Sequence, residues 1–330
     1  MSRKKIINYS YLLSALLLIL VACKKDEYTI PSPKSELSND AIKRTLGPNI
    51  VGDTIQFAYA MALPPAKGKL VSAQVEATFA GATGTYLENK SYYTKANGQD
   101  TGVLVGQASV NSGAVTKVTF NRDTSAATLR FFYITPEEAR GKTVTFTFSA
   151  TSSDGGNVSY KMGPYNVAKM SLVRNLAVNN ATANFISIAD MKVYNAAAAA
   201  TNAANIDLVY LYRAAPATFL HALVSPAADA QYLPAVTLPA GVNKSTKLMK
   251  VFNLQDYNLA YTQFGIYIDD LDFQQINLSA APNFAINLKA EAGAWAETAD
   301  GRYRAYIYMN SVNTNGSAVI SIKRYDMQSK

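Results

Sequence analysis

Three carboxylates gather in one short segment, Asp269-Asp270-Leu271-Asp272, and their type suggests ion binding. Carboxylate oxygens are ligands that Ca²⁺ prefers in proteins, so Asp269, Asp270 and Asp272 are candidate Ca²⁺ ligands. Their spacing is not that of an EF-hand loop, and the alternative is a solvated loop that holds no ion. No other cofactor is predicted, because the chain contains neither a phosphate-binding loop nor a dinucleotide fingerprint.

Aromatic side chains offer a second kind of chemistry. An aromatic ring can cover the apolar face of a sugar while neighbouring polar groups fix its orientation. One candidate glycan site surrounds the single tryptophan: Trp295, Glu297, Asp300, Arg302 and Tyr303. A second candidate patch consists of tyrosines: Tyr86, Tyr92 and Tyr93. For both groups the alternative interpretation is ordinary packing inside the fold.

The residues needed for catalysis are scarce. His221 is the only histidine, and no Gly-x-Ser-x-Gly elbow is present, so we interpret His221 as a loop or core residue. One histidine and one cysteine are too few for a structural zinc site. A glycosidase needs two carboxylates about 5–10 Å apart, and the sequence alone nominates no pair. We therefore expect a non-enzymatic protein, with a hidden glycoside hydrolase as the alternative.

The amino terminus has the features of a secretion signal. Arg3, Lys4 and Lys5 precede an apolar stretch over 12–22, which is too short for a membrane-spanning helix of about 20 residues. The stretch ends in Leu20-Val21-Ala22-Cys23, which resembles the lipobox of bacterial lipoproteins. The resemblance implies a signal peptide over 1–22, cleavage before Cys23, and lipidation of Cys23. Acyl chains on this residue would anchor the protein to a membrane.

The residues after the cysteine bear on location. Lys24-Lys25-Asp26-Glu27 resembles the surface-export signal of Bacteroidota lipoproteins, which implies display on the outer surface of the outer membrane. Retention on the periplasmic face is the alternative. Residues 23–36 contain two prolines and no periodicity, and we predict a lipidated tether there.

Composition restricts the partners. The net charge falls from +8 to +5 when the three cations of the signal peptide are removed. The remaining basic residues are scattered, so no nucleic-acid partner is predicted. Cleavage would leave about 308 residues, enough for two domains. The many tyrosine, valine, threonine and phenylalanine residues favour strands.

Residues 37–168 show the alternation of apolar and polar residues that is typical of strands. It is clearest at 143–151, where Val144, Phe146 and Phe148 share one face. Further strands are expected at 54–61, 70–79, 117–120, 127–134 and 158–167. Residues 134–167 resemble the last strands of bacterial immunoglobulin-like domains, and the resemblance implies an immunoglobulin-like β-sandwich.

Residues 169–330 are predicted to form a second β-rich, sandwich-like domain, so that the whole protein is mainly β. A short helix is expected over 195–204, where five alanines follow one another. Strands are expected at 184–188, 206–213, 264–268 and 284–288, and long surface connections over 214–248. A terminal hairpin over 302–309 and 318–325 should turn near Asn315-Gly316. This order resembles the C-terminal halves of uncharacterised Bacteroidota surface lipoproteins.

These features predict a cell-surface lipoprotein that binds glycan within an outer-membrane nutrient-capture system. Its expected partners are the membrane, a polysaccharide and outer-membrane uptake proteins. The alternative is a structural or adhesive surface protein that binds another protein or acts as a spacer. An exposed aromatic row beside acids would favour glycan binding, whereas an open sheet edge would favour a protein partner.

Overall fold

The computed structural model describes residues 34–216, 218–260 and 265–328. The predicted signal peptide (1–22), the predicted lipidation site Cys23 and most of the predicted tether (23–36) lie outside these residues. Within the described ranges, no helix is long and apolar enough to cross a membrane.

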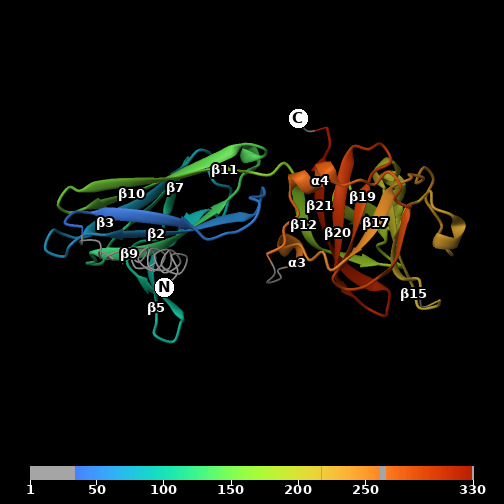
Figure 1. The fold of residues 1–330 in the computed structure, drawn as a ribbon, viewed down its shortest axis with the longest axis horizontal. Helices are drawn as coiled ribbons and strands as arrows, with labels where there is room; N and C mark the ends of the chain where they lie inside the picture. The colour runs from blue at the N-terminus through green and yellow to red at the C-terminus, as the bar shows by residue number, and fades with distance from the viewer. Residues whose placement is uncertain (1–33, 217, 261–264, 329–330) are drawn as a thin grey trace, which may run out of the picture. The chain divides into compact units, whose positions relative to one another are not determined.

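The described residues up to 167 form a β-sandwich of two antiparallel sheets (Figure 1). One sheet has the order β1-β2-β9-β4 and the other the order β11-β10-β3-β8-β7. Their strands are β1 (Ser38–Lys43), β2 (Thr54–Ala62), β3 (Leu70–Ala77), β4 (Tyr86–Leu87), β7 (Val110–Ser112), β8 (Val115–Thr119), β9 (Ala126–Ile134), β10 (Thr143–Ser152) and β11 (Asn157–Asn166). A separate hairpin, β5 (Lys90–Thr94) and β6 (Asp100–Leu104), extends away from the two sheets.

Aromatic side chains fill the space between the two sheets. The strand predicted over 143–151 is confirmed as β10, whose inward residues Phe146 and Phe148 are fully buried. Their rings meet Phe57 of β2 in the facing sheet, at centroid distances of 4.7 and 5.2 Å. Burial of rings this large supplies most of the driving force for pairing the sheets. A single 3-10 turn, η1 (Glu137–Ala139), leads into β10.

The remaining residues form two five-stranded antiparallel sheets with short helices. The sheet orders are β12-β21-β20-β19-β17 and β14-β13-β15-β16-β18. The strands are β12 (Ser171–Asn179), β13 (Phe185–Ser187), β14 (Lys192–Tyr194), β15 (Leu208–Arg213), β16 (Leu220–Val224), β17 (Lys247–Phe252), β18 (Phe284–Leu288), β19 (Ala292–Glu297), β20 (Tyr303–Val312) and β21 (Ser317–Asp326). The helices are α2 (Ala196–Thr201), α3 (Tyr257–Ala260) and α4 (Asp270–Gln275), with 3-10 turns η2 (Ala203–Asn205) and η3 (Ala230–Tyr232).

The sheet that ends in β17 is buried on both faces. Its inner face contributes small and aliphatic side chains, such as Ala294 and Ile307, to the core between the sheets. Its outer face carries larger rings, including Tyr306 and Trp295, which pack against Leu259 of α3 and Phe273 of α4. The helices therefore cover the sheet as a third layer (Figure 1).

A buried ion pair joins this third layer to the sheet. The ammonium of Lys323 in β21 lies 2.6 Å from Asp256 Oδ2, and both side chains are inaccessible to solvent. The same ammonium donates to the carbonyl of Ile268 at 2.7 Å. Burial lowers the pKa of Lys323, although the charge of Asp256 opposes this shift. Because each charge depends on its partner for solvation, neither can be lost alone without a large penalty.

The predicted elements of this half are partly confirmed. The short helix appears as α2, with Asn195 as its side-chain cap, and the terminal hairpin appears as β20 and β21, with Gly316 at φ +82°. The strand predicted at 264–268 is wrong for its described residues, 265–268. There Ile268 N–H donates to the Asp256 carboxylate instead of a neighbouring strand. Residues 214–248 are not only connections, since they contain β16.

Replacing Lys323 with methionine should destabilise the second half by about 3–5 kcal/mol, because Asp256 would keep a buried, unpaired charge. Urea unfolding followed by the fluorescence of Trp295, the only tryptophan, measures the change. Lys247→Met is the matched control, since Lys247 pairs with Glu297 at a partly exposed position and should lose less than about 1 kcal/mol. Equal losses of unfolding free energy in the two variants would contradict the stabilising role of the buried Lys323–Asp256 pair.

Candidate ligand-binding site

Trp295 does not form the exposed platform that the sequence suggested. It lies in β19 with 5% of its surface exposed. Its ring packs against Phe273 of α4 and Tyr306 of β20, at centroid distances of 5.3 and 5.0 Å. A sugar could stack on this ring only if α4 left the sheet.

The other members of the predicted Trp295 site are separated by the alternation of strand residues. Glu297 lies on the same face as Trp295 and accepts hydrogen bonds from Lys247 and Arg304 at 3.1 and 3.0 Å. Burial alone would raise the pKa of Glu297, but these hydrogen bonds outweigh it and lower the pKa. Tyr303 belongs to the opposite, inner face, so the structure does not assemble this site.

Tyr303 and Arg302 take part in a stack of charged and aromatic groups. The guanidinium groups of Arg302 and Arg324 each lie 4.8 Å from the centre of the Tyr303 ring. Arg302 also pairs with Asp326 at 3.2 Å. The ring face is therefore occupied by cations of the protein itself.

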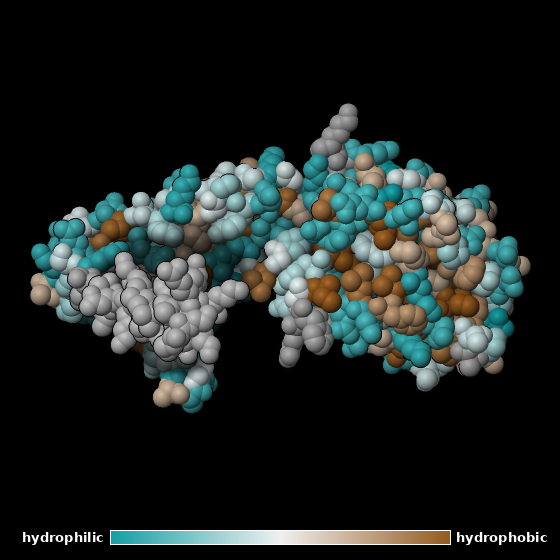
Figure 2. Space-filling model, in the orientation of Figure 1, coloured by the Kyte–Doolittle hydropathy of each residue, from teal (hydrophilic) through white to brown (hydrophobic). Residues whose placement is uncertain are grey.

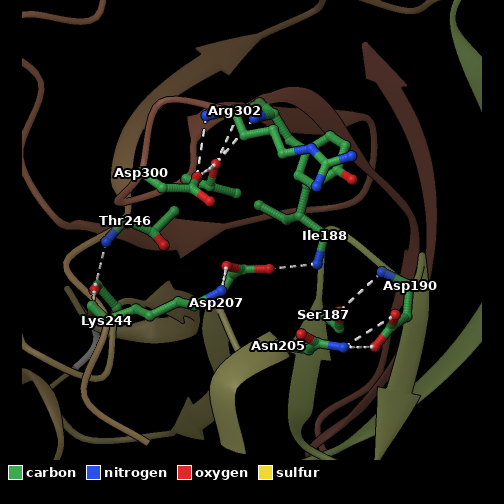
Figure 3. A network of polar contacts seen from close by, with 12 residues as sticks. Ser187, Ile188, Asp190, Asn205, Asp207, Lys244, Thr246, Asp300 and Arg302 are labelled. Atoms are coloured by element: carbon green, nitrogen blue, oxygen red, sulfur yellow. Dashed lines mark hydrogen bonds and ion pairs between the residues drawn. The ribbon is translucent and has the colours of Figure 1, made fainter. Parts of the chain in front are cut away.

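A polar network in the second half contains Asp300, a member of the predicted Trp295 site, and the buried Asp207, which the sequence did not single out (Figure 3). Asp207 is fully buried and accepts hydrogen bonds from Ile188 N–H at 2.7 Å and from Lys244 Nζ at 2.9 Å. Burial raises the pKa of Asp207. Asp300 accepts from the hydroxyl of Thr298 within the β19–β20 turn. Both carboxylates hold strands and turns together, and Asp207 cannot touch an external ligand.

The acidic segment proposed for Ca²⁺ is the start of a helix. Asp269 caps α4 and accepts from the N–H groups of Leu271 and Asp272, and the Asp272 carboxylate accepts from Asp269 N–H. Asp270 accepts from the N–H groups of Lys169 and Met170. The three carboxylates are thus engaged by backbone donors, and the described residues contain no group of acids, histidines or cysteines suited to a metal ion.

The tyrosine patch, in contrast, lies on an exposed face of the first sandwich. Tyr86 of β4 stands opposite Phe132 of β9 on the outer side of their sheet. The two rings stack in parallel, with centroids 4.7 Å apart and 12° between their planes. Phe132 covers one face of Tyr86, and Tyr86 remains 42% exposed, so its other face is open to a ligand.

A second ring extends this surface along β9. The guanidinium of Arg130, two residues before Phe132, lies 3.8 Å from the centre of the Tyr92 ring. Arg130 also pairs with Asp100 of the β5–β6 hairpin, and the Tyr92 hydroxyl donates to Glu88 Oε1 at 2.6 Å. Tyr86, Glu88, Tyr92, Arg130 and Phe132 form a continuous set that we call the aromatic face.

The two tyrosines of the β5–β6 hairpin, Tyr92 and Tyr93, point to opposite faces of it. Tyr92 crosses over Gly102, its partner in β6, where an added Cβ would lie 3.0 Å from the ring. This absence of a side chain lets the ring reach Arg130. Tyr93, the next residue, points to the opposite face of the hairpin and is 53% exposed, so it is not part of the aromatic face.

Sequence reasoning identified the tyrosines but missed Glu88, Arg130 and Phe132. The available signal was the alternation of β9, whose inward residues Leu129, Phe131 and Tyr133 leave 130 and 132 on the outer side. An aromatic residue at an outward position of a strand is the kind of exception that marks a surface site.

The lone histidine, His221, lies in β16 and is almost completely buried. Its Nδ1 is 2.7 Å from the hydroxyl of Tyr210 in the adjacent strand, and burial lowers the pKa of His221 below its ordinary value of 6.5. Its position in the core makes it a packing residue.

The chain is thus a protein of two successive β-sandwich halves, with an exposed aromatic face on the first. Comparisons with known proteins divide it similarly: the DUF4466 model matches residues 34–167 and the DUF8576 model residues 168–327, both described as domains of unknown function. A crystal structure of a DUF4466 family protein from Parabacteroides merdae is 46% identical, covers 89% of this chain and 100% of its own, and has a TM-score of 0.86. The chain belongs to the DUF4466 family. No curated protein matches it.

The buried histidine should make stability depend on pH near 6. Because the folded-state pKa of His221 is lowered, the unfolded chain binds a proton that the folded chain does not, and the free energy of unfolding should fall as the pH falls from about 7 to 5. Tryptophan-monitored urea unfolding across this range should show a steeper fall for the native chain than for His221→Gln. Identical slopes would contradict the expected shift.

Proposed function

We propose that this protein is a non-enzymatic lipoprotein of the bacterial cell surface that binds glycan through its aromatic face. The observation that carries the proposal is the open ring face of Tyr86 beside the Glu88 carboxylate and the Tyr92–Arg130 stack. An aromatic platform with nearby groups that accept hydrogen bonds is suited to sugars, which present an apolar face and a ring of hydroxyls.

The proposed location rests on the amino terminus, outside the described residues. The basic start, the short apolar stretch and Leu20-Val21-Ala22-Cys23 support lipidation at Cys23, and the following Lys and acidic residues support surface display. A relative from the Bacteroidota is consistent with an outer-membrane nutrient-capture system. We also infer that the first sandwich is immunoglobulin-like.

A structural or adhesive role is the second candidate, and a different surface favours it. Hydrophobic side chains reach the surface over β17 (Figure 2), the edge strand of its sheet. Phe252 at the end of β17 is 58% exposed, with the Lys250 ammonium 4.6 Å from the centre of its ring. An edge strand that ends in an exposed aromatic side chain can pair with another protein.

Glycan binding can be tested with the lipid-free chain from Lys24 to the C-terminus. Affinity electrophoresis and calorimetry against a broad polysaccharide panel should give at least one hit, and Tyr86→Ala should weaken it by about tenfold or more through loss of the stacking surface. Tyr160→Ala is the matched control, because Tyr160 of β11 is similarly exposed (39%) on the other sheet.

Binding that survives Tyr86→Ala would remove the aromatic face from consideration. If the native chain bound no polysaccharide of the panel, the adhesive role would become the favoured hypothesis. A Phe252→Ala variant would then be examined for lost attachment to other surface proteins.

The anchor can be tested independently. Cys23→Ser should abolish incorporation of a labelled fatty acid and release the protein from the membrane fraction. If Asp26 and Glu27 direct surface display, replacing both with alanine should leave lipidation intact. The variant should then resist a protease added to whole cells, whereas the native protein should be cleaved. Full accessibility of that variant would contradict the export role, and retained membrane attachment of Cys23→Ser would contradict lipidation.

A further inference from the structure

The charges around the aromatic face narrow the class of glycan, an inference that rests on the proposed function. Glu88 directly follows β4, and its side chain meets Tyr92, whose ring stacks on Arg130 at an outward position of β9. Its N–H donates to the carbonyl of Arg130 on β9, which fixes the backbone beside the stacked rings. The carboxylate is also near enough to Tyr86 for its charge to act on that side chain.

The carboxylate is held in one orientation by its neighbours. Its Oε1 accepts the Tyr92 hydroxyl at 2.6 Å, and the Tyr92 ring is fixed in turn by the Arg130 guanidinium on one side and by the close approach to Gly102. A group positioned before the ligand arrives loses little conformational freedom on binding.

The positive groups nearby are largely compensated. Arg130 pairs with Asp100. A hydrogen bond from Thr94, followed by the charges of Arg130 and Arg44, lowers the pKa of Asp100. Lys90, on the same side of the hairpin as Tyr92, is exposed to solvent, where its charge is screened. The pKa of Tyr86 is raised first by partial burial and then by the negative charge of Glu88.

We propose that the ligand is a neutral, hydroxyl-rich glycan, stacked on the open face of Tyr86 and hydrogen-bonded through its hydroxyl groups to the Glu88 carboxylate. An ionised carboxylate only accepts hydrogen bonds, and sugar hydroxyls supply the donors. A uronate or sulfate group at the same place would set two like charges a few ångströms apart and is disfavoured.

The test is calorimetry of the lipid-free chain with paired probes: galactan against polygalacturonate, and dextran and other neutral polysaccharides against their carboxymethylated or sulfated forms. The native chain should bind a neutral member at least about tenfold more tightly than its charged counterpart. Glu88→Gln should weaken the neutral ligand and narrow this preference. Glu76→Gln, at an exposed carboxylate of β3 on the other sheet, should change neither.

The possible outcomes distinguish a wrong class of glycan from a wrong proposal of glycan binding. A charged polymer that binds more tightly than its neutral partner, and is lost in Tyr86→Ala, would overturn the neutral class while leaving glycan binding in place. An unchanged preference in Glu88→Gln would overturn the role of the carboxylate. Failure of every probe, neutral and charged, would overturn the proposed function together with the inference.

Discussion

Successive side chains of a strand point to opposite faces of a sheet, and this constraint governs every site in the molecule. In β19 and β20 it places Trp295 under α4 and Tyr303 in the core between the sheets. In β4 and β9 it places Tyr86 and Phe132 together on an open face. Residues that are close in sequence are therefore separated, and residues 46 positions apart become partners.

The two halves of the chain use their polar side chains differently. In the second half, carboxylates such as Asp207, Asp256 and Asp270 are engaged by backbone N–H groups and ammonium groups of the protein itself. These carboxylates hold loops and helices against the sheets, so they stabilise the fold. On the first half, Glu88 and Arg130 instead organise rings that remain in contact with solvent. The aromatic face therefore differs from these carboxylate sites in presenting ordered groups that the fold does not bury.

Much of the fold could be predicted because alternation and turn residues act locally. The strand at 143–151 and the terminal hairpin at Gly316 follow from their own sequences. The strand expected at 264–268 is absent from its described residues, 265–268, where the Asp256 side chain accepts the Ile268 N–H in place of a neighbouring strand. β16 escaped prediction because its neighbours are rich in proline and alanine, and because one of its two partner strands, β18, lies far away in the sequence.

The sequence by itself determined the mainly β composition and the aromatic and acidic candidates, and it carries the motif on which the proposed anchor at Cys23 rests. Only the tertiary structure decided which of these candidates are exposed to solvent and which are buried. Burial of Trp295 depends on α4, a helix formed by residues twenty or more positions away, and the stacking of Tyr86 depends on β9. Exposure is a property of what packs above a residue, and that neighbour is fixed by long-range pairing, which local residue patterns do not encode.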